Sequence, residues 1–136
     1  NMSKRILFVC KHNRFRSKVA EAFFKKFNKN KKYVSSSAGL IPGARLFDIG
    51  QVKIAREFGI KLKGKPKPIT TDLLKKMNTM VIVADNVPAK IFGNKKYGRN
   101  EYVWKIRDSI NNKDDETREI IYKIKKRVIE FVENLK

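Results

Sequence analysis

Residues 5–17 read RILFVCKHNRFRS, and this stretch decides the fold. Residues 5–9 form a short, mostly apolar run, which is typical of a buried strand. A polar loop follows, and apolar side chains then recur at helical spacing over residues 17–28. The stretch therefore predicts a strand, a loop and an amphipathic helix in direct succession.

The same alternation continues along the chain. Further strands are predicted at residues 32–36, 79–84 and 101–106. Further helices are predicted at residues 48–58, at about 70–77 and from 114 onward, with Asp48 as an N-cap. Residues 38–43 carry glycine and proline and predict a loop, and residues 86–98 predict a loop with at most a short helix. Strands that alternate with helices predict a four-stranded parallel sheet, doubly wound, with helices on both faces in a flavodoxin-like three-layer α/β fold.

Composition limits the classes of protein. A chain of 136 residues suits one domain, which we expect to span residues 1–136. No apolar run approaches the roughly 18 residues of a membrane span, and the first residues lack the long apolar stretch of a signal peptide. One cysteine excludes an internal disulfide. We therefore expect a cytoplasmic protein with no membrane partner.

The chain is strongly basic. Its 33 Lys and Arg residues against 13 Asp and Glu residues give a formal net charge of +20. Such a charge attracts phosphates, nucleic acids and acidic surfaces. The lysines are spread over predicted helices and loops, so nucleic-acid binding is expected only through nonspecific charge.

The loop after the first predicted strand carries a candidate site. Five residues separate Cys10 from Arg16, and Ser17 begins the next helix. A loop of this length can turn the backbone N–H groups of residues 11–17 toward one oxyanion, while the guanidinium of Arg16 grips two phosphate oxygens. A helix N-terminus with a nearby guanidinium and hydroxyl favours a thiolate at Cys10. The pattern predicts Cys10 as a nucleophile and Arg16 as a phosphate clamp.

Residues 9–17 (VCKHNRFRS) and 20–22 (AEA) resemble the opening of the low-molecular-weight protein tyrosine phosphatases and their arsenate reductase relatives. The resemblance continues at Ser37-Ala38-Gly39, at residues 65–70 (KPKPIT) and at residues 81–85 (VIVAD). It implies the same fold, a phosphocysteine intermediate and an aspartate that acts as general acid and then as base. The best match for that aspartate is Asp108, with Asp85 as the alternative.

The same comparison assigns the loop residues. It implies a phosphate-binding loop made of Lys11, His12, Asn13, Arg14, Phe15, Arg16 and Ser17. Asn13 matches a family asparagine that braces the loop backbone. Arg14 suggests an acidic or multiply phosphorylated partner.

Several positions depart from the family pattern. His12 replaces the usual glycine, and either contacts phosphate, caps the loop or tunes Cys10. Phe15 replaces a frequent second cysteine, which removes a protective disulfide. Ser109 replaces the proline that usually follows the acid, and the tyrosines usually found beyond it are absent. Aromatic residues at other positions either line a pocket or belong to the core; they are Phe47, Phe92, Tyr97 and Trp104.

Three functions compete at this point. The first is a phosphatase, which takes a phosphorylated protein or a small phosphomonoester, releases inorganic phosphate and needs no metal or cofactor. The second is a basic module that binds phosphate or nucleic acid without turnover. The third is an arsenate reductase; because the chain lacks further cysteines, that reaction would need an external thiol.

Overall fold

The computed structural model describes residues 3–43, 47–92 and 99–135. The strands are β1 (Lys4–Cys10), β2 (Tyr33–Gly39), β3 (Thr79–Val83) and β4 (Asn100–Trp104). The helices are α1 (Arg16–Phe27), α2 (Ile49–Glu57), α3 (Thr71–Lys76) and α4 (Asp114–Glu133), with a short 3-10 helix η1 (Ala89–Ile91). No helix in this part of the chain is long and apolar enough to cross a membrane.

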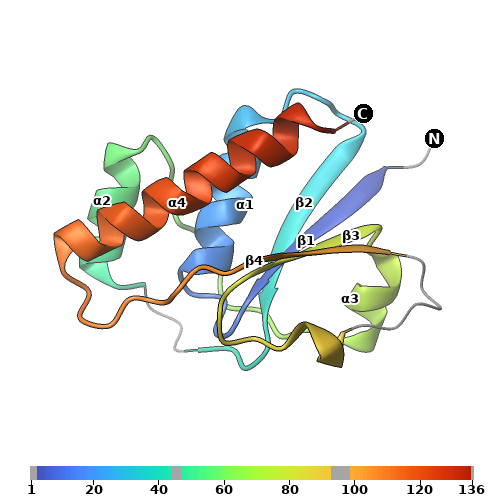
Figure 1. Cartoon of the computed structure of the whole chain (residues 1–136), viewed down its shortest axis with the longest axis horizontal. Helices are drawn as coiled ribbons and strands as arrows, with labels where there is room; N and C mark the ends of the chain where they lie inside the picture. Colours follow the sequence, from blue (N-terminus) through green and yellow to red (C-terminus); the bar gives the residue numbers. More distant parts are fainter. Residues whose placement is uncertain (1–2, 44–46, 93–98, 136) are drawn as a thin grey trace.

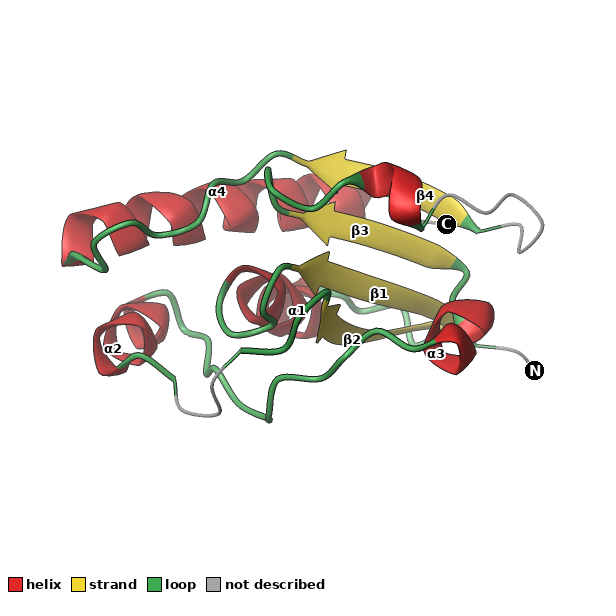
Figure 2. Cartoon of the chain, turned by 90° about the horizontal axis from the view of Figure 1, so that it is seen from below, coloured by secondary structure: helices red, strands yellow, loops and turns green. Residues whose placement is uncertain are grey.

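The four strands form one parallel sheet in the order β2-β1-β3-β4, which confirms the predicted fold class (Figure 1). All four arrowheads point the same way, so the carboxyl ends of the strands share one edge (Figure 2). The order of connection reverses between β1 and β3, and ligands of such sheets bind at the crevice beside this switch point. The loop after β1 begins there.

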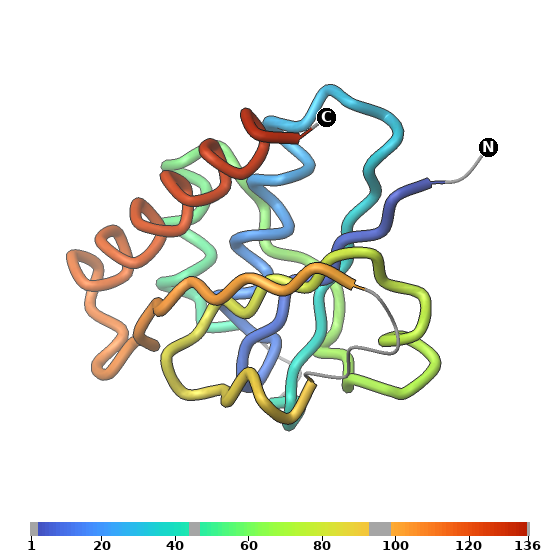
Figure 3. The backbone as a smooth tube through the Cα atoms, turned by 45° about the vertical axis from the view of Figure 1, so that its right-hand side comes forward, coloured from blue at the N-terminus to red at the C-terminus, as the bar shows by residue number. Residues whose placement is uncertain are grey.

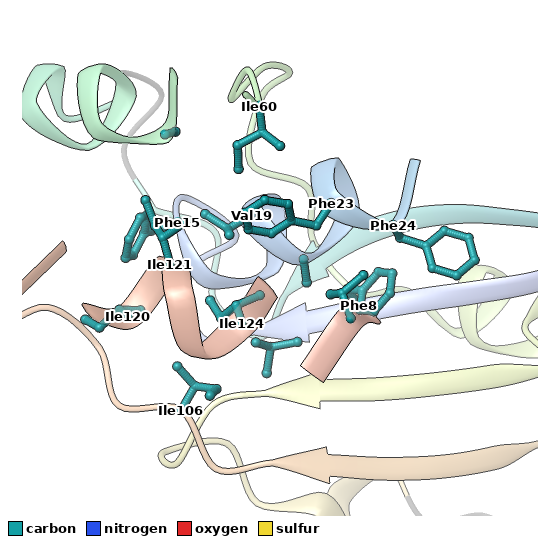
Figure 4. Close-up of a cluster of buried hydrophobic side chains, with 14 of the residues drawn as sticks. Phe8, Phe15, Val19, Phe23, Phe24, Ile60, Ile106, Ile120, Ile121 and Ile124 are labelled. Atoms are coloured by element: carbon teal, nitrogen blue, oxygen red, sulfur yellow. The ribbon is translucent and has the colours of Figure 1, made fainter. Parts of the chain in front are cut away.

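Both faces of the sheet are covered, which explains the continuous apolar run of β1. Ile6 and Phe8 face a larger core shared with α1, α2 and α4, whereas Leu7 and Val9 face a smaller core completed by α3. All four side chains are at most 1% exposed. Figure 3 shows α4 running beside α1, and Figure 4 shows Phe8 among the isoleucines and phenylalanines of the larger core. Strands buried on both faces lose the polar alternation of a half-exposed strand.

The second strand is longer than predicted. It was expected to end at Ser36, with Ala38 and Gly39 in the following loop, but β2 continues to Gly39. These last residues pair in register with Phe8, Val9 and Cys10. The small and polar residues of this segment have little strand propensity, and they are in a strand because they pair with β1. The predicted loop over residues 86–98 contains η1 in its described part, while residues 93–98 lie outside the described residues.

Gly39 is required by a close approach of two backbones. A Cβ atom at this position would lie 2.8 Å from the backbone nitrogen of Asn13 and 2.8 Å from the carbonyl carbon of His12. Backbone atoms cannot move aside as a flexible side chain can. The end of β2 and the loop after β1 therefore fit together only with glycine at this position.

We expect Gly39→Ala to lower the free energy of unfolding by about 1–3 kcal/mol, because the added methyl group overpacks this contact. Urea unfolding followed by circular dichroism measures the change. Gly50→Ala is the control: Gly50 lies in α2, where alanine favours the helix, and should change stability by less than about 1 kcal/mol. Equal stability of wild type and Gly39→Ala would contradict the close approach.

Candidate active site

The loop of residues 10–17, called the Cys10 loop below, is held along its first half by the segment after β2. Backbone N–H groups of Leu40, Ile41 and Gly43 donate to the carbonyl oxygens of Cys10, Lys11 and His12 at 2.8–3.1 Å. Asn13 then turns the chain with φ 55°, a left-handed conformation that asparagine tolerates better than most residues. Helix α1 begins three residues later, at Arg16.

A chain of hydrogen bonds ends on the sulfur of Cys10. The backbone N–H of Lys67 donates to Asn13 Oδ1 at 2.9 Å, and Asn13 Nδ2 donates to Ser17 Oγ at 2.7 Å. Ser17 Oγ lies 3.0 Å from Cys10 Sγ, and Cys10 is 2% exposed. Because Ser17 already accepts from Asn13, its own hydroxyl proton is available to donate to the sulfur. This arrangement places a hydroxyl donor within reach of the Cys10 sulfur.

Arg16 is buried and joins the Cys10 loop to the ends of β3 and β4. One guanidinium nitrogen donates to the carbonyl oxygen of Ile106 at 2.9 Å, and the other terminal nitrogen donates to Asn86 Oδ1 at 3.0 Å. The carboxylates of Asp85 and Asp108 lie 3.7 and 3.5 Å from the guanidinium. A guanidinium has five N–H donors, so these two hydrogen bonds orient the group and leave donors for an anion.

A pocket of about 200 Å³ opens above the Cys10 loop. It brings together Cys10, Arg16 and Asp108, which the sequence analysis took from two distant segments. Asp85 is 46% exposed and Asp108 42% exposed, but of these two only Asp108 is among the residues that line the pocket. The lining residues are Cys10, His12, Arg14, Phe15, Arg16, Asp48, Gln51, Asp108, Ser109 and Asn112.

The other residues of the Cys10 loop divide between lining the pocket and bracing the loop. His12 lines the pocket and donates from Nδ1 to the carbonyl oxygen of Ile41 at 2.8 Å, so its ring also holds the loop. The side chain of Arg14 passes close to Gly43, where a Cβ atom would lie 2.6 Å from Arg14 Cδ. Asn13 and Ser17 are fully buried and brace the loop from behind.

One part of the pocket lining, a wall formed by Asp48, Gln51 and Asn112, is polar. Asp48 caps α2 by accepting from the backbone N–H of Gln51 at 2.9 Å. The side chain of Asn112 donates to Asp48 at 3.5 Å and accepts from that of Gln51 at 3.3 Å, so the wall joins α2 to the segment after β4.

Three of the four aromatic candidates belong to the core rather than to this wall. Phe92 and Trp104 are each 5% exposed within the two cores, and Phe47 packs against the larger one. Tyr97 lies outside the described residues. Phe15 is the aromatic residue found in the pocket lining.

Glu116, at the start of α4, organises the segment that carries Asp108. Its carboxylate accepts from Arg107 at 2.7 Å and from the Ser109 hydroxyl at 2.7 Å, and also from the backbone N–H groups of Ile110 and Asn111. Hydrogen bonds from Arg107 and then Ser109 lower the pKa of Glu116 to about 2. The sequence analysis missed this residue, because an acidic first turn is equally expected from the helix dipole.

Asn86 was missed as well, since nothing in a turn after a strand marks the partner of a distant arginine.

Within residues 3–43, 47–92 and 99–135, no cluster of three or more His, Cys, Asp or Glu side chains could hold a metal ion. The pocket brings together the thiol of Cys10, the buried guanidinium of Arg16 and the carboxyl group of Asp108.

The chain belongs to the low-molecular-weight phosphotyrosine protein phosphatase family, because the family model with that description matches residues 5–136. This match confirms the resemblance found in the sequence. No curated protein sequence matches the chain significantly.

Solved structures share this fold. A low-molecular-weight protein tyrosine phosphatase from T. tengcongensis has a TM-score of 0.82 at 19% identity, covering 98% of this chain and 100% of that chain. An arsenate reductase from Archaeoglobus fulgidus has a TM-score of 0.73 at 25% identity, covering 95% and 99%. The YwlE arginine phosphatase from Geobacillus stearothermophilus has a TM-score of 0.80 at 15% identity, covering 96% and 91%. The same fold is thus found in a tyrosine phosphatase, an arsenate reductase and an arginine phosphatase.

The low pKa of Glu116 predicts a pH dependence of stability. A carboxyl group whose pKa is lowered by folding stabilises the fold above its unfolded pKa, and this stabilisation is lost as the pH falls toward about 2. Between about pH 6 and pH 3, the free energy of unfolding should therefore fall more for the wild type than for Glu116→Gln. Urea unfolding at both pH values measures this difference.

The control is Glu130→Gln, which removes an exposed carboxylate from the same helix and should keep the pH dependence of the wild type. A wild type and a Glu116→Gln variant with the same loss of stability at low pH would contradict the role of Glu116 in holding this segment.

Proposed function

We propose that this chain is a cysteine-dependent phosphatase that hydrolyses phosphomonoesters, with phosphotyrosine in proteins as the first candidate substrate. One observation carries the proposal: Cys10, Arg16 and Asp108 share a single pocket, and the Cys10 sulfur lies 3.0 Å from the Ser17 hydroxyl oxygen. Charge-assisted donors around a phosphate, a thiolate below it and a carboxyl group above it are the parts that the reaction needs.

In the first step the Cys10 thiolate attacks phosphorus. An Sγ–P bond forms while the bond from phosphorus to the leaving oxygen breaks, and Asp108 donates its proton to that oxygen. The guanidinium of Arg16 and the backbone N–H groups of residues 11–17 hold the other phosphate oxygens through the transition state. The product alcohol or phenol leaves.

In the second step water attacks the phosphocysteine. Asp108, now a carboxylate, takes a proton from the water as the oxygen bonds to phosphorus and the Sγ–P bond breaks. Inorganic phosphate leaves, Cys10 returns to the thiolate and Asp108 is again protonated. The proton that Asp108 gives to the leaving oxygen is replaced by one from water, so the cycle consumes one water molecule and restores the side chains of the site.

Two exposed isoleucines support a protein as substrate. Ile49 and Ile110 are each 85% exposed, and in the chain they directly follow two residues of the pocket lining, Asp48 and Ser109. Exposed apolar side chains that adjoin pocket residues in the chain suit contact with residues that flank a phosphorylated side chain. A cytoplasmic location and nonspecific attraction of nucleic acid remain predictions from composition.

A second candidate substrate is phosphoarginine. The wall formed by Asp48, Gln51 and Asn112 is polar and carries a carboxylate, which suits a cationic guanidinium better than a phenol ring. A solved structure with the same fold is titled an arginine phosphatase. In this alternative the bond that breaks joins phosphorus to nitrogen, and Asp108 protonates that nitrogen.

Hydrolysis of p-nitrophenyl phosphate tests the reaction class. We expect Cys10→Ser to abolish turnover and Asp108→Asn to lower kcat by about 10²–10⁴-fold, because the leaving oxygen is no longer protonated. Asp85→Asn is the matched control, since it removes a second carboxylate near Arg16 and should have a much smaller effect.

Other outcomes identify the competing functions. Turnover that survives in Cys10→Ser would refute the mechanism, and equal losses in the two aspartate variants would refute the role of Asp108. No wild-type turnover, with thiol consumed in the presence of arsenate, would indicate an arsenate reductase that uses an external thiol. For an active phosphatase, the ratio of kcat/KM for phosphotyrosyl and phosphoarginyl versions of one peptide decides between the two substrates.

A further inference from the structure

Lys18 is a buried cation that the proposed reaction does not use. It follows Ser17 in the first turn of α1 and is 5% exposed. Its ammonium group donates to the carbonyl oxygen of Lys65 at 3.1 Å. Burial lowers the pKa of Lys18, although the nearby Glu21 carboxylate opposes this effect. An ammonium group has three donors, and burying one with incomplete compensation is costly unless a ligand completes its contacts.

Lys18 lines a second pocket, which holds about 480 Å³ and lies apart from the one above the Cys10 loop. Six lysines surround this lysine pocket: Lys18, Lys25, Lys61, Lys63, Lys65 and Lys67. Glu21 lines it too, but both of its carboxylate oxygens are engaged, one by Ser37 at 2.6 Å and one by Lys25 at 2.8 Å. The pocket therefore presents a strong excess of positive charge.

Residues 61–67 contribute four of these lysines, and their backbone conformation places them beside Lys18. Gly64 has φ +86° and approaches Lys18, whose Nζ would lie 3.1 Å from a Cβ atom at this glycine. The backbone of Lys67 is fixed from both sides, since its N–H donates to Asn13 and its carbonyl oxygen accepts from Gly39 at 2.8 Å. Like charges held together this way repel one another, and a bound anion would relieve the repulsion.

We propose that the lysine pocket is a second anion-binding site, which takes a compact polyphosphate anion. Its volume lies in the range of small-molecule sites. Among the described residues that line it there is no aromatic side chain on which a base could stack, which argues against single-stranded nucleic acid. Lysine ammonium groups act as point charges and suit several phosphate groups packed into a small volume.

Calorimetric titration with inorganic tripolyphosphate tests this site. Orthovanadate, added at one equivalent, occupies the pocket above the Cys10 loop in every titration, and the ionic strength is held constant. We expect the double variant Lys61→Gln/Lys63→Gln to raise the Kd by about tenfold or more, because two exposed cations leave the pocket. The control Lys75→Gln/Lys76→Gln, on α3, removes the same charge elsewhere and should change the Kd less than about twofold.

Equal affinity in all three proteins would overturn the proposal, and so would equal losses in both variants, which would indicate delocalised charge. Tighter binding of hexaglutamate or of oligouridylate than of tripolyphosphate, abolished by the same double variant, would replace the assigned ligand with an acidic polypeptide or RNA. The titrations measure no turnover, so their failure would leave the proposed phosphatase reaction untouched. Circular dichroism of both variants checks that they remain folded.

Discussion

The burial of the Arg16 guanidinium is the constraint on which the arrangement of the site depends. A charge that is 1% exposed must be compensated by its neighbours, because removing an ion from water without partners is very costly. Ile106 and Asn86 compensate it by hydrogen bonds, and the carboxyl groups of Asp85 and Asp108 lie 3.7 and 3.5 Å away. These partners come from the segments after β3 and β4, so one side chain brings three strand ends together. Disturbing any of these segments would leave a buried charge with too few partners.

Much of the fold could be predicted from the sequence, because strands that are buried on both faces of a parallel sheet are continuous apolar runs. The apolar run of β1 and the helical spacing in α1 predicted the first unit, and the alternation of strands and helices predicted the rest. The end of β2 could not be predicted, since Ser37, Ala38 and Gly39 are strand residues only by pairing with β1. Their pairing brings Gly39 against the Cys10 loop, so the error fell on a segment that shapes the site.

The candidate site was predictable where its residues are adjacent in the chain. Cys10, Arg16 and Ser17 fall in one loop, whereas Asp108 was found only through resemblance to a family. The site is also supported from distant segments, by Glu116, Asn86 and the backbone of Lys67. Contacts between distant segments produce no characteristic spacing in the sequence, so they could not be predicted. The polar wall of Asp48, Gln51 and Asn112 likewise depends on how α2 meets the segment after β4. The sequence analysis left open whether aromatic residues line the pocket, and it did not predict this polar wall. The substrate is therefore the property that the sequence predicts least well.

The central claim is that phosphate passes through a covalent bond to Cys10. Its most direct test is acid quenching of Asp108→Asn during turnover of a phosphorylated substrate, followed by mass spectrometry of the peptide that contains Cys10. We expect phosphate on the Cys10 sulfur, since loss of the base slows attack by water on the phosphocysteine. Product release with no phosphate on Cys10 at any time point, or with phosphate on another residue, would contradict it.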